Sequence, residues 1–501
     1  MLPNIESHQA DIISRFSIAT GMDVSVHAIR GGWAGLRPYV ELEDVVFLEP
    51  ASSTSLARPA GAIALKLPRL TAELSWWSLI AGQVRFAEIV LDGPELAISR
   101  NQDGFIYFAG RALNQPKSTE DDGQLLTFLL EQPGLAIRNA TLTWNDELTP
   151  GSTLRFTEVG LQIKKRGSGH RLGFTAAPPV RLARRIDVNG DLQLDNVDGR
   201  WIVKGTLYTA ATDASLTELR QHAPVPTALQ TGIGNLRAWI EIDNTITPLS
   251  VAASSAASLP APVSASTAPV FKYAAFNPIR AITADLHLIN VRAQLDTDLA
   301  PLNIAKLAGR IEYKAQEGGF MVGSKALEIL TREGVVLPPT DFSLTLQHQN
   351  DVTKAKGEIS GNDIDLKVMA ALMESFPVSK DLRGLATRYQ PRGLVKNTVF
   401  AWSGFLEKPS GYHIKSTLKN FGLNSDGKNP GVTDFSGTIE GDDKGGKFNI
   451  ASKMLVLDEP HIFRAPLKFD TFDSTGKWRV NQDAIQVDFS NVNFANADLT
   501  G

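Results

Sequence analysis

Apolar and polar positions alternate with a period of two along most of the chain. Three clear runs are Ile186-Val188-Gly190-Leu192-Leu194, Leu236-Ala238-Ile240-Ile242 and Phe342-Leu344-Leu346. Such alternation is typical of β-strands with one apolar and one polar face. Gly, Asn and Asp separate the runs, as at residues 165–169 and 317–319, where tight hairpin turns are expected. The pattern therefore predicts a mostly β protein.

The number of such runs also constrains the shape of the sheet. The pattern gives on the order of twenty strands, whereas twisted open sheets rarely exceed about ten strands without curling or splitting. We therefore expect an elongated, curled, antiparallel sheet whose apolar side chains face inward. Such a sheet would form an apolar groove, resembling a folded taco.

Helices are expected to be few and short. Residues 4–20 predict one amphipathic helix, because Ile5, Ile12, Ile13 and Phe16 fall on one face at 3.6 residues per turn. Shorter helices are expected near residues 74–79, 125–132, 215–222 and 302–307. A helical pair is predicted at 367–389, broken by Pro377.

The chain divides into segments by composition. We assign residues 1–20 to the N-terminal helix, 21–248 to a first β segment and 272–501 to a second. Between them, residues 249–271 are rich in Ala, Ser and Pro, a composition that cannot bury enough apolar surface to order itself. This insertion is interpreted as a flexible loop projecting from one continuous sheet, or as a linker between two domains.

Charge and cysteine content exclude several classes of protein. The 501 residues carry 50 basic and 54 acidic side chains, a net charge of −4, which gives no electrostatic reason to expect a nucleic-acid partner. The chain has no Cys, so thiolate zinc sites are excluded. No run approaches the ~20 apolar residues of a membrane-spanning helix.

Motifs that could carry chemistry are weak. Residues 441–447 match the spacing GxxxxGK of a phosphate loop, but Phe448 replaces the Ser or Thr that would hold magnesium, and a strand follows. A hairpin turn is the better interpretation. The eight His are far apart, and acidic pairs such as Asp442-Asp443 lie in polar turns. We therefore predict a protein that is not an enzyme, with no catalytic residue, metal or cofactor.

Several short motifs succeed one another over most of the chain. They are Trp33-Ala-Gly35-Leu36-Arg-Pro38, Leu74-Ser-Trp76-Trp77-Ser-Leu79-Ile-Ala-Gly82, Leu91-Asp-Gly93-Pro94-Glu-Leu96, Asp103-Gly104, Pro391-Arg392-Gly393, Trp402-Ser403-Gly404, Tyr412, Phe421, Pro430-Gly431, Phe435-Ser436-Gly437 and Leu467-Lys-Phe469-Asp470. None is specific alone, but their order resembles that of the YhdP family of AsmA-like proteins.

The resemblance implies a periplasmic conduit that carries phospholipid between the inner and outer membranes of Gram-negative bacteria. It implies attachment to the inner membrane through an anchor that this chain does not contain, with inner- or outer-membrane proteins as further partners. Relative to the family pattern the chain lacks that anchor and the later strands and terminal helices, so we expect it to be a fragment.

The candidate lipid-contacting residues are apolar positions of the alternating runs. They are Leu192, Leu194, Ile240, Ile242, Phe342, Leu344, Leu346, Phe448, Ile450, Leu455, Leu457, Val487 and Phe489. The same alternation would also build a closed, ligand-free sandwich core. In that case the protein would be a scaffold or regulator of outer-membrane assembly. A polysaccharide-active β enzyme is a third hypothesis, which would require carboxylates that converge in a cleft.

Overall fold

The structure is a computed structural model that describes residues 10, 13–14, 17, 23–48, 63–74, 86–108, 111–112, 132–148, 153–197, 200–222, 228–243, 279–316, 318–347, 355–376, 380–405, 408–481 and 484–501. The chain divides into two compact units. Unit 1 comprises residues 1–224, 235–259 and 275–279, and unit 2 comprises residues 225–234, 260–274 and 280–501. Strands dominate both units, so the predicted mostly β fold is confirmed.

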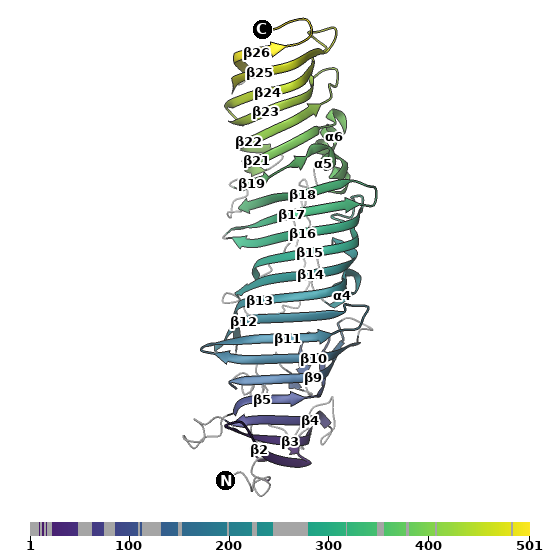
Figure 1. Cartoon of the computed structure of the whole chain (residues 1–501), viewed down its shortest axis with the longest axis vertical. Coiled ribbons are helices and arrows are strands. Elements are labelled where there is room, and N and C mark those ends of the chain that lie inside the picture. The colour runs from purple at the N-terminus through teal and green to yellow at the C-terminus, as the bar shows by residue number, and fades with distance from the viewer. Residues whose placement is uncertain are drawn as a thin grey trace, which may run out of the picture. The chain divides into compact units, whose positions relative to one another are not determined.

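Unit 1 is built on long antiparallel strands that pair mostly in chain order (Figure 1). Its elements are β1 (Asp23–Ser25), β2 (Ala28–Ala34), β3 (Arg37–Leu48), β4 (Ile63–Leu74), β5 (Phe86–Asp92), β6 (Glu95–Arg100), β7 (Ile106–Phe108), β8 (Arg111–Ala112), β9 (Gly134–Asp146), β10 (Thr153–Arg166), β11 (Gly169–Ala177), β12 (Arg185–Val197), β13 (Arg200–Ser215) and α4 (Leu216–His222). Strand β14 (Leu229–Asp243) is divided between the two units.

The antiparallel prediction fails at one place in unit 1, where β9 runs parallel to both β5 and β6. Strands β5 and β6 act as one strand interrupted by Gly93-Pro94, because β5 pairs with residues 135–138 of β9 and β6 with residues 141–146. Gly93 has φ +68°, and Pro94 cannot donate to a ladder, so the strand breaks there.

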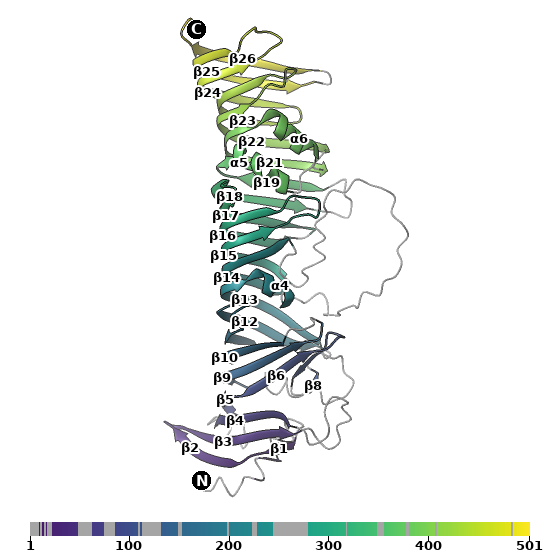
Figure 2. The same cartoon turned by 90° about the vertical axis from the view of Figure 1, so that its right-hand side faces the viewer.

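In unit 2 the strands stack in chain order (Figures 1 and 2). Its elements are β15 (Ile279–Ala293), β16 (Leu302–Gln316), β17 (Gly319–Thr331), β18 (Val336–Gln347), β19 (Lys356–Gly361), β20 (Ile364–Asp365), α5 (Leu366–Leu372), η3 (Met373–Ser375), α6 (Lys380–Tyr389), β21 (Arg392–Phe405), β22 (Lys408–Leu423), β23 (Gly431–Asp442), β24 (Gly445–Asp458), β25 (Leu467–Val480) and β26 (Ile485–Ala495).

Most of the long strands contain a residue with positive φ in their interior. These residues are Asp44, Asn139, Glu158, Asp213, Asn290, Ala326, Asn397, Asn420, Asp434, Met454 and Asn491. Register shifts accompany many of them, as between Ser324 and Leu327 around Ala326. A bulge adds a residue to one strand and bends it. In β15 the buried positions change from even to odd numbers across the bulge, from Leu288 to Val291, so the apolar side chains stay on one face through the bend.

Neighbouring side chains satisfy the backbone N–H groups that the bulges release from the ladder. The Asn420 N–H donates to Ser436 Oγ at 3.0 Å, and the Ala326 N–H donates to Asp341 Oδ1 at 2.7 Å. A buried or half-buried N–H without an acceptor would be costly. The polar residues at the bends are therefore part of what permits the curvature.

The helices match the sequence only in part. Helix α4 lies at the predicted 215–222, and α5, η3 and α6 lie within 366–389. Residues 302–307 were predicted as helix but begin β16, because Leu302, Ile304 and Leu307 alternate across a register shift rather than along a helix face. Of the predicted helix at 4–20 only Ala10, Ile13, Ser14 and Ser17 are described, and each is helical. The insertion at 249–271, the predicted helix at 74–79 beyond its first residue and that at 125–132 before its last lie outside the described residues.

Candidate binding surface on the apolar face

A continuous row of apolar positions crosses unit 2 from β15 to β26. Each member is the direct cross-strand partner of the next, and we call these positions the apolar row: Ile282, Tyr313, Val322, Leu344, Ile359, Phe400, Ile414, Gly441, Gly446, Trp478 and Val487. None of its nine side chains is buried; eight are half-buried and Val487 is 45% exposed. Among the described residues, these positions are thus not covered as the second sheet of a sandwich would cover them. Further along β15 to β18 the same face is buried, because the cross-strand partners Leu288, Leu307, Ile329 and Leu337 are at most 8% exposed.

The residues next to the apolar row, one position along each strand, are mostly polar or charged. The adjacent positions on the opposite face form the polar row: Thr283, Glu312, Gly323, Ser343, Ser360, Val399, Lys415, Glu440, Lys447, Lys477 and Asp488. Because successive side chains of a strand point to opposite faces, unit 2 has one apolar and one polar face.

Ion pairs and hydrogen bonds join charged side chains across the polar face. Arg310 Nε lies 2.7 Å from Asp285 Oδ1, and this hydrogen bond raises the pKa of the guanidinium. Lys447 Nζ lies 3.3 Å from Glu440 Oε2. Its hydrogen bond and the charge of Lys415 lower the pKa of Glu440. A cavity of about 740 Å³ over β21–β26 is lined by charged residues of the polar row, among them Lys415, Glu440 and Lys477, and also by Ile439 and Phe448.

Aromatic rings fill the glycine positions of the apolar face. A Cβ placed on Gly446 would lie 2.2 Å from Trp478 Cη2, and one placed on Gly441 would lie 2.3 Å from Trp478 Cζ2. On the neighbouring row Phe448 covers Gly476 in the same way, at 2.1 Å. The Phe448 ring centroid lies 6.4 Å from that of Trp478 and 5.3 Å from that of Phe489. The face therefore stays continuous and apolar where the sequence has glycine.

Small buried side chains lie beside the bends of unit 2. Ser324 and Ser452 directly precede the bulges of β17 and β24 and are 4% and 2% exposed. Ser324 Oγ donates to the Thr340 carbonyl at 3.3 Å, and Ser452 Oγ donates to the Ser436 carbonyl at 3.1 Å. These hydroxyls are satisfied by neighbouring carbonyls. On the other side of each bulge the apolar residue, Leu327 or Leu455, is buried.

Unit 1 has an equivalent row, but its first part is closed. Cross-strand partners run from Val40 through Ala72, Ile89, Leu135, Ile163, Leu172 and Gly190 to Leu207. Val40, Ala72, Ile89 and Leu135 are buried, whereas Ile163, Leu172 and Leu207 are half-buried. The row changes from covered to uncovered between β9 and β10.

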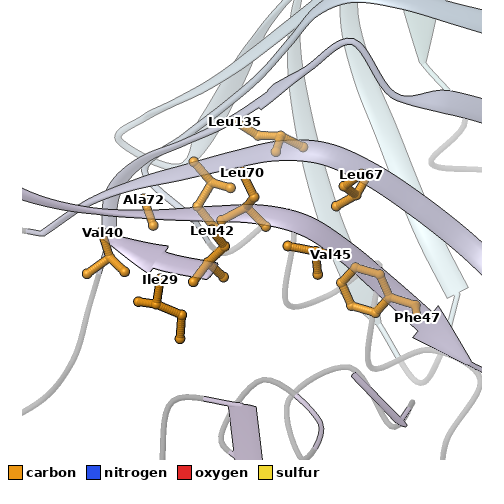
Figure 3. Packing of buried hydrophobic residues seen from close by; sticks show 10 residues of the cluster. Ile29, Val40, Leu42, Val45, Phe47, Leu67, Leu70, Ala72 and Leu135 are labelled. Atoms are coloured by element: carbon orange, nitrogen blue, oxygen red, sulfur yellow. The ribbon is translucent and has the colours of Figure 1, made fainter. Parts of the chain in front are cut away.

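The closed part of unit 1 is a core made of its own side chains (Figure 3). Leu42, Val45 and Leu67 are at most 2% exposed and pack with Phe47 and Leu70. Side chains from β1, β4, β5, β7 and β10 complete the cluster.

The predicted lipid-contacting residues occupy different environments. Leu344 and Val487 belong to the apolar row, and Phe342, Phe448 and Phe489 to the row beside it. Leu346 lies in the row on the other side of the apolar row, opposite Phe320 and Gly357. Leu192, Leu194, Ile240, Ile242 and Leu457 are half-buried. Ile450 and Leu455 are 8% and 6% exposed and so are core positions in the free protein.

Sequence reasoning missed several members of the apolar row. Ile359, Phe400, Ile414 and Trp478 each continue the alternation of their strands, which is the signal that could have found them. Their alignment with Leu344 depends on strand register, which is a tertiary property.

Other candidate chemistry finds little support. Residues 441–446 form the two-residue hairpin between β23 and β24, with Asp442 Oδ1 accepting from the Lys444 and Gly445 N–H groups, so the hairpin interpretation is confirmed. The part of the chain that the structure describes holds no group of three or more His, Cys, Asp or Glu placed to bind a metal. Within the same residues, no helix combines the length and apolar character needed to cross a membrane.

The fold and this surface define a class of protein: long, mostly antiparallel strands with bulges, whose sheet in unit 2 has one charged face and one apolar face that is uncovered in part. The chain belongs to the YhdP protein family, whose model matches residues 1–261 and 275–501. Neither the curated proteins nor the solved structures compared with the chain gave a match. Membership of this family suggests AsmA-like lipid transport as its general role.

Proposed function

We propose that the chain is a non-enzymatic, periplasmic conduit that carries phospholipid between the inner and outer membranes. The acyl chains lie against the apolar face, and the headgroups remain in water. In the cell the protein is attached to the inner membrane. One observation carries the proposal: the apolar row of unit 2 crosses eleven positions on successive strands without a buried side chain.

The physical case rests on what the uncovered face can offer a lipid. At about 0.8 kcal/mol per methylene, roughly thirty methylenes of a two-chain lipid cost on the order of 25 kcal/mol to expose to water. A continuous apolar face removes much of that cost. Exposed apolar patches of this extent mark interaction sites in soluble proteins. Acyl chains match a row of aliphatic and aromatic side chains that has few polar groups to satisfy.

Site-specific photocrosslinking tests the proposal directly. A photoreactive phenylalanine at Leu344, in the apolar row, should yield adducts with phospholipid when the chain is irradiated in Gram-negative cells labelled with radioactive phosphate. Ser343 provides the matched control, because it is the adjacent residue of β18 and belongs to the polar row. Crosslinking at Ser343 should give no phospholipid adduct.

The competing function is a scaffold or regulator of outer-membrane assembly with a closed core. The filled cluster around Val45 favours it for the first strands of unit 1. It predicts protein adducts alone at Leu344. Equal phospholipid labelling at Leu344 and Ser343 would also contradict the conduit, since it would indicate contact without a preferred face.

A further inference from the structure

Helix α6 differs from the other described helices because it buries none of its residues. Helices α4 and α5 each bury a leucine, Leu216 and Leu372. In α6, Leu382 and Leu385 are each 46% exposed. They are three residues apart and therefore share one side of the helix.

The remaining surface of α6 is basic. Lys380, Arg383 and Arg388 outnumber the single acid, Asp381. At 100° per residue Lys380 and Arg383 fall on the side away from the two leucines. Arg388 lies three residues after Leu385 and pairs with Asp426 at 3.9 Å. Exposed leucines on one side and Lys or Arg on the other are typical of helices that lie in the interface of a bilayer.

The C-terminal end of α6 is fixed to the turn that joins β22 and β23. Tyr389 Oη donates to Asp426 Oδ2 at 2.9 Å, and the Asn424 N–H donates to the Tyr389 carbonyl at 2.8 Å. Backbone N–H groups of Asn429 and Lys428 hold the pKa of Asp426 below its usual range, so this acceptor stays ionised. The helix is thus held beside the ends of β22 and β23 (Figure 1). We call this border of unit 2, which is formed by strand ends, the edge of the sheet.

We propose that α6 docks this edge of the sheet on a bilayer surface that contains anionic phospholipid. Leu382 and Leu385 enter the headgroup region, and Lys380 and Arg383 face the phosphates. Basic residues close to a membrane are attracted to anionic lipid surfaces, and salt weakens this attraction. The inference extends the proposed function, because it names where the conduit meets the lipid that its apolar face holds.

Vesicle flotation of the whole chain tests this proposal. Vesicles of phosphatidylcholine with phosphatidylglycerol are compared with vesicles of phosphatidylcholine alone, at low and high salt. The chain should bind the anionic vesicles more tightly, and high salt should weaken that binding. Lys380→Gln/Arg383→Gln should reduce the partition constant on the order of tenfold or more. Leu385→Ser should weaken binding to both kinds of vesicle.

A charge-matched control separates α6 from the overall charge of the protein. Lys453→Gln/Lys477→Gln removes two exposed cations from β24 and β25 and should bind as the parent does. The proposal is overturned if this control loses as much binding as the α6 variant, or if the parent binds neither vesicle or both equally. Circular dichroism verifies that each variant is folded. Phospholipid crosslinking at Leu344 is scored separately, so failure of the docking site and failure of the conduit give different results.

Discussion

The first strands of unit 1 and several strands of unit 2 contain the same kind of bulge, but the side chains beside the bulge differ. In β3 the bulge at Asp44 lies between Leu42 and Val45, which are 1% and 0% exposed and belong to a filled core. In β17 and β24 the position that precedes the bulge is Ser324 or Ser452. The difference shows that the bend alone does not create an open face. Side-chain size beside the bend does not separate the two units completely, because Leu288 and Val291 flank the bulge of β15 in unit 2 and are 2% and 1% exposed.

The largest expected effect comes from placing a charge in the closed core of unit 1 and comparing it with a charge on the apolar row of unit 2. Val45→Asp should destabilise unit 1 by about 3–5 kcal/mol, because it buries a carboxylate without a partner. Leu344→Asp should cost on the order of 1 kcal/mol, since the half-exposed side chain can reach water, but it should abolish phospholipid adducts at neighbouring positions of the apolar row. Native-state hydrogen exchange in β3 and β18 measures the two costs separately.

The comparison would fail if Leu344→Asp lost as much protection as Val45→Asp. That result would mean that the apolar row is a packed core and that the closed-core interpretation extends to unit 2. Ser343→Asp, on the polar row of the same strand, is the control and should leave β18 protection nearly unchanged.

The next largest loss of stability is expected where an aromatic ring covers a glycine. In Gly357→Ala the new Cβ would lie 2.0 Å from Trp402 Cζ2, so the indole, which is 5% exposed, must move. Overpacking of this kind typically costs 1–3 kcal/mol, so we expect a loss of about 2 kcal/mol in urea unfolding. Gly411→Ala is the control, because the nearest atom to its Cβ, Asp443 Oδ1, is 3.6 Å away. Equal losses in both variants would show that the ring is not held over the glycine.

A smaller effect tests the bend itself. Asn420 has φ +49° at the bulge of β22, a conformation that β-branched residues rarely adopt. Asn420→Val should therefore cost on the order of 1–2 kcal/mol, whereas Asn420→Gly should be nearly neutral. Urea unfolding of both variants measures the difference. If valine and glycine were tolerated equally, the left-handed residue would not be what bends the strand.

The sequence predicted the strand content and the two-faced character of unit 2 because alternation is a local property. It underestimated strand length, because the apolar parity changes at each bulge. Residues 448–450 and 455–457 read as two runs, yet they form one strand, β24, interrupted at Lys453-Met454. Arg138-Asn139 and Lys419-Asn420 are the same signal: a polar residue and an Asn between apolar positions of opposite parity.

The candidate surface was predictable only as a set of strands. That Leu344 aligns with Ile359 and Phe400 follows from register, and the burial of Ile450 depends on neighbours distant in sequence. The closed core of unit 1 was not distinguishable from an open face, because its strands alternate in the same way. The parallel pairing of β9 with β5 depends on the break at Gly93-Pro94, which reads as an ordinary turn.

The smallest expected effect concerns the attachment of α6 and its dependence on pH. Hydrogen bonds lower the folded-state pKa of Asp426, so the carboxylate stabilises the attachment at all pH values above its ordinary value of about 4. As pH falls below that value, protons bind the unfolded segment more readily than the folded one, and the stabilisation is lost progressively toward the folded pKa. Hydrogen exchange of α6, corrected for intrinsic rates, should therefore be constant from neutral pH to about pH 4 and faster below it.

In Asp426→Asn, α6 should exchange faster at neutral pH and lose this acid dependence, whereas Asp443→Asn, in the β23–β24 hairpin, should keep the parent profile. An unchanged acid response in Asp426→Asn would mean that another group holds α6 at the edge of the sheet, and that the Tyr389–Asp426 contact is incidental.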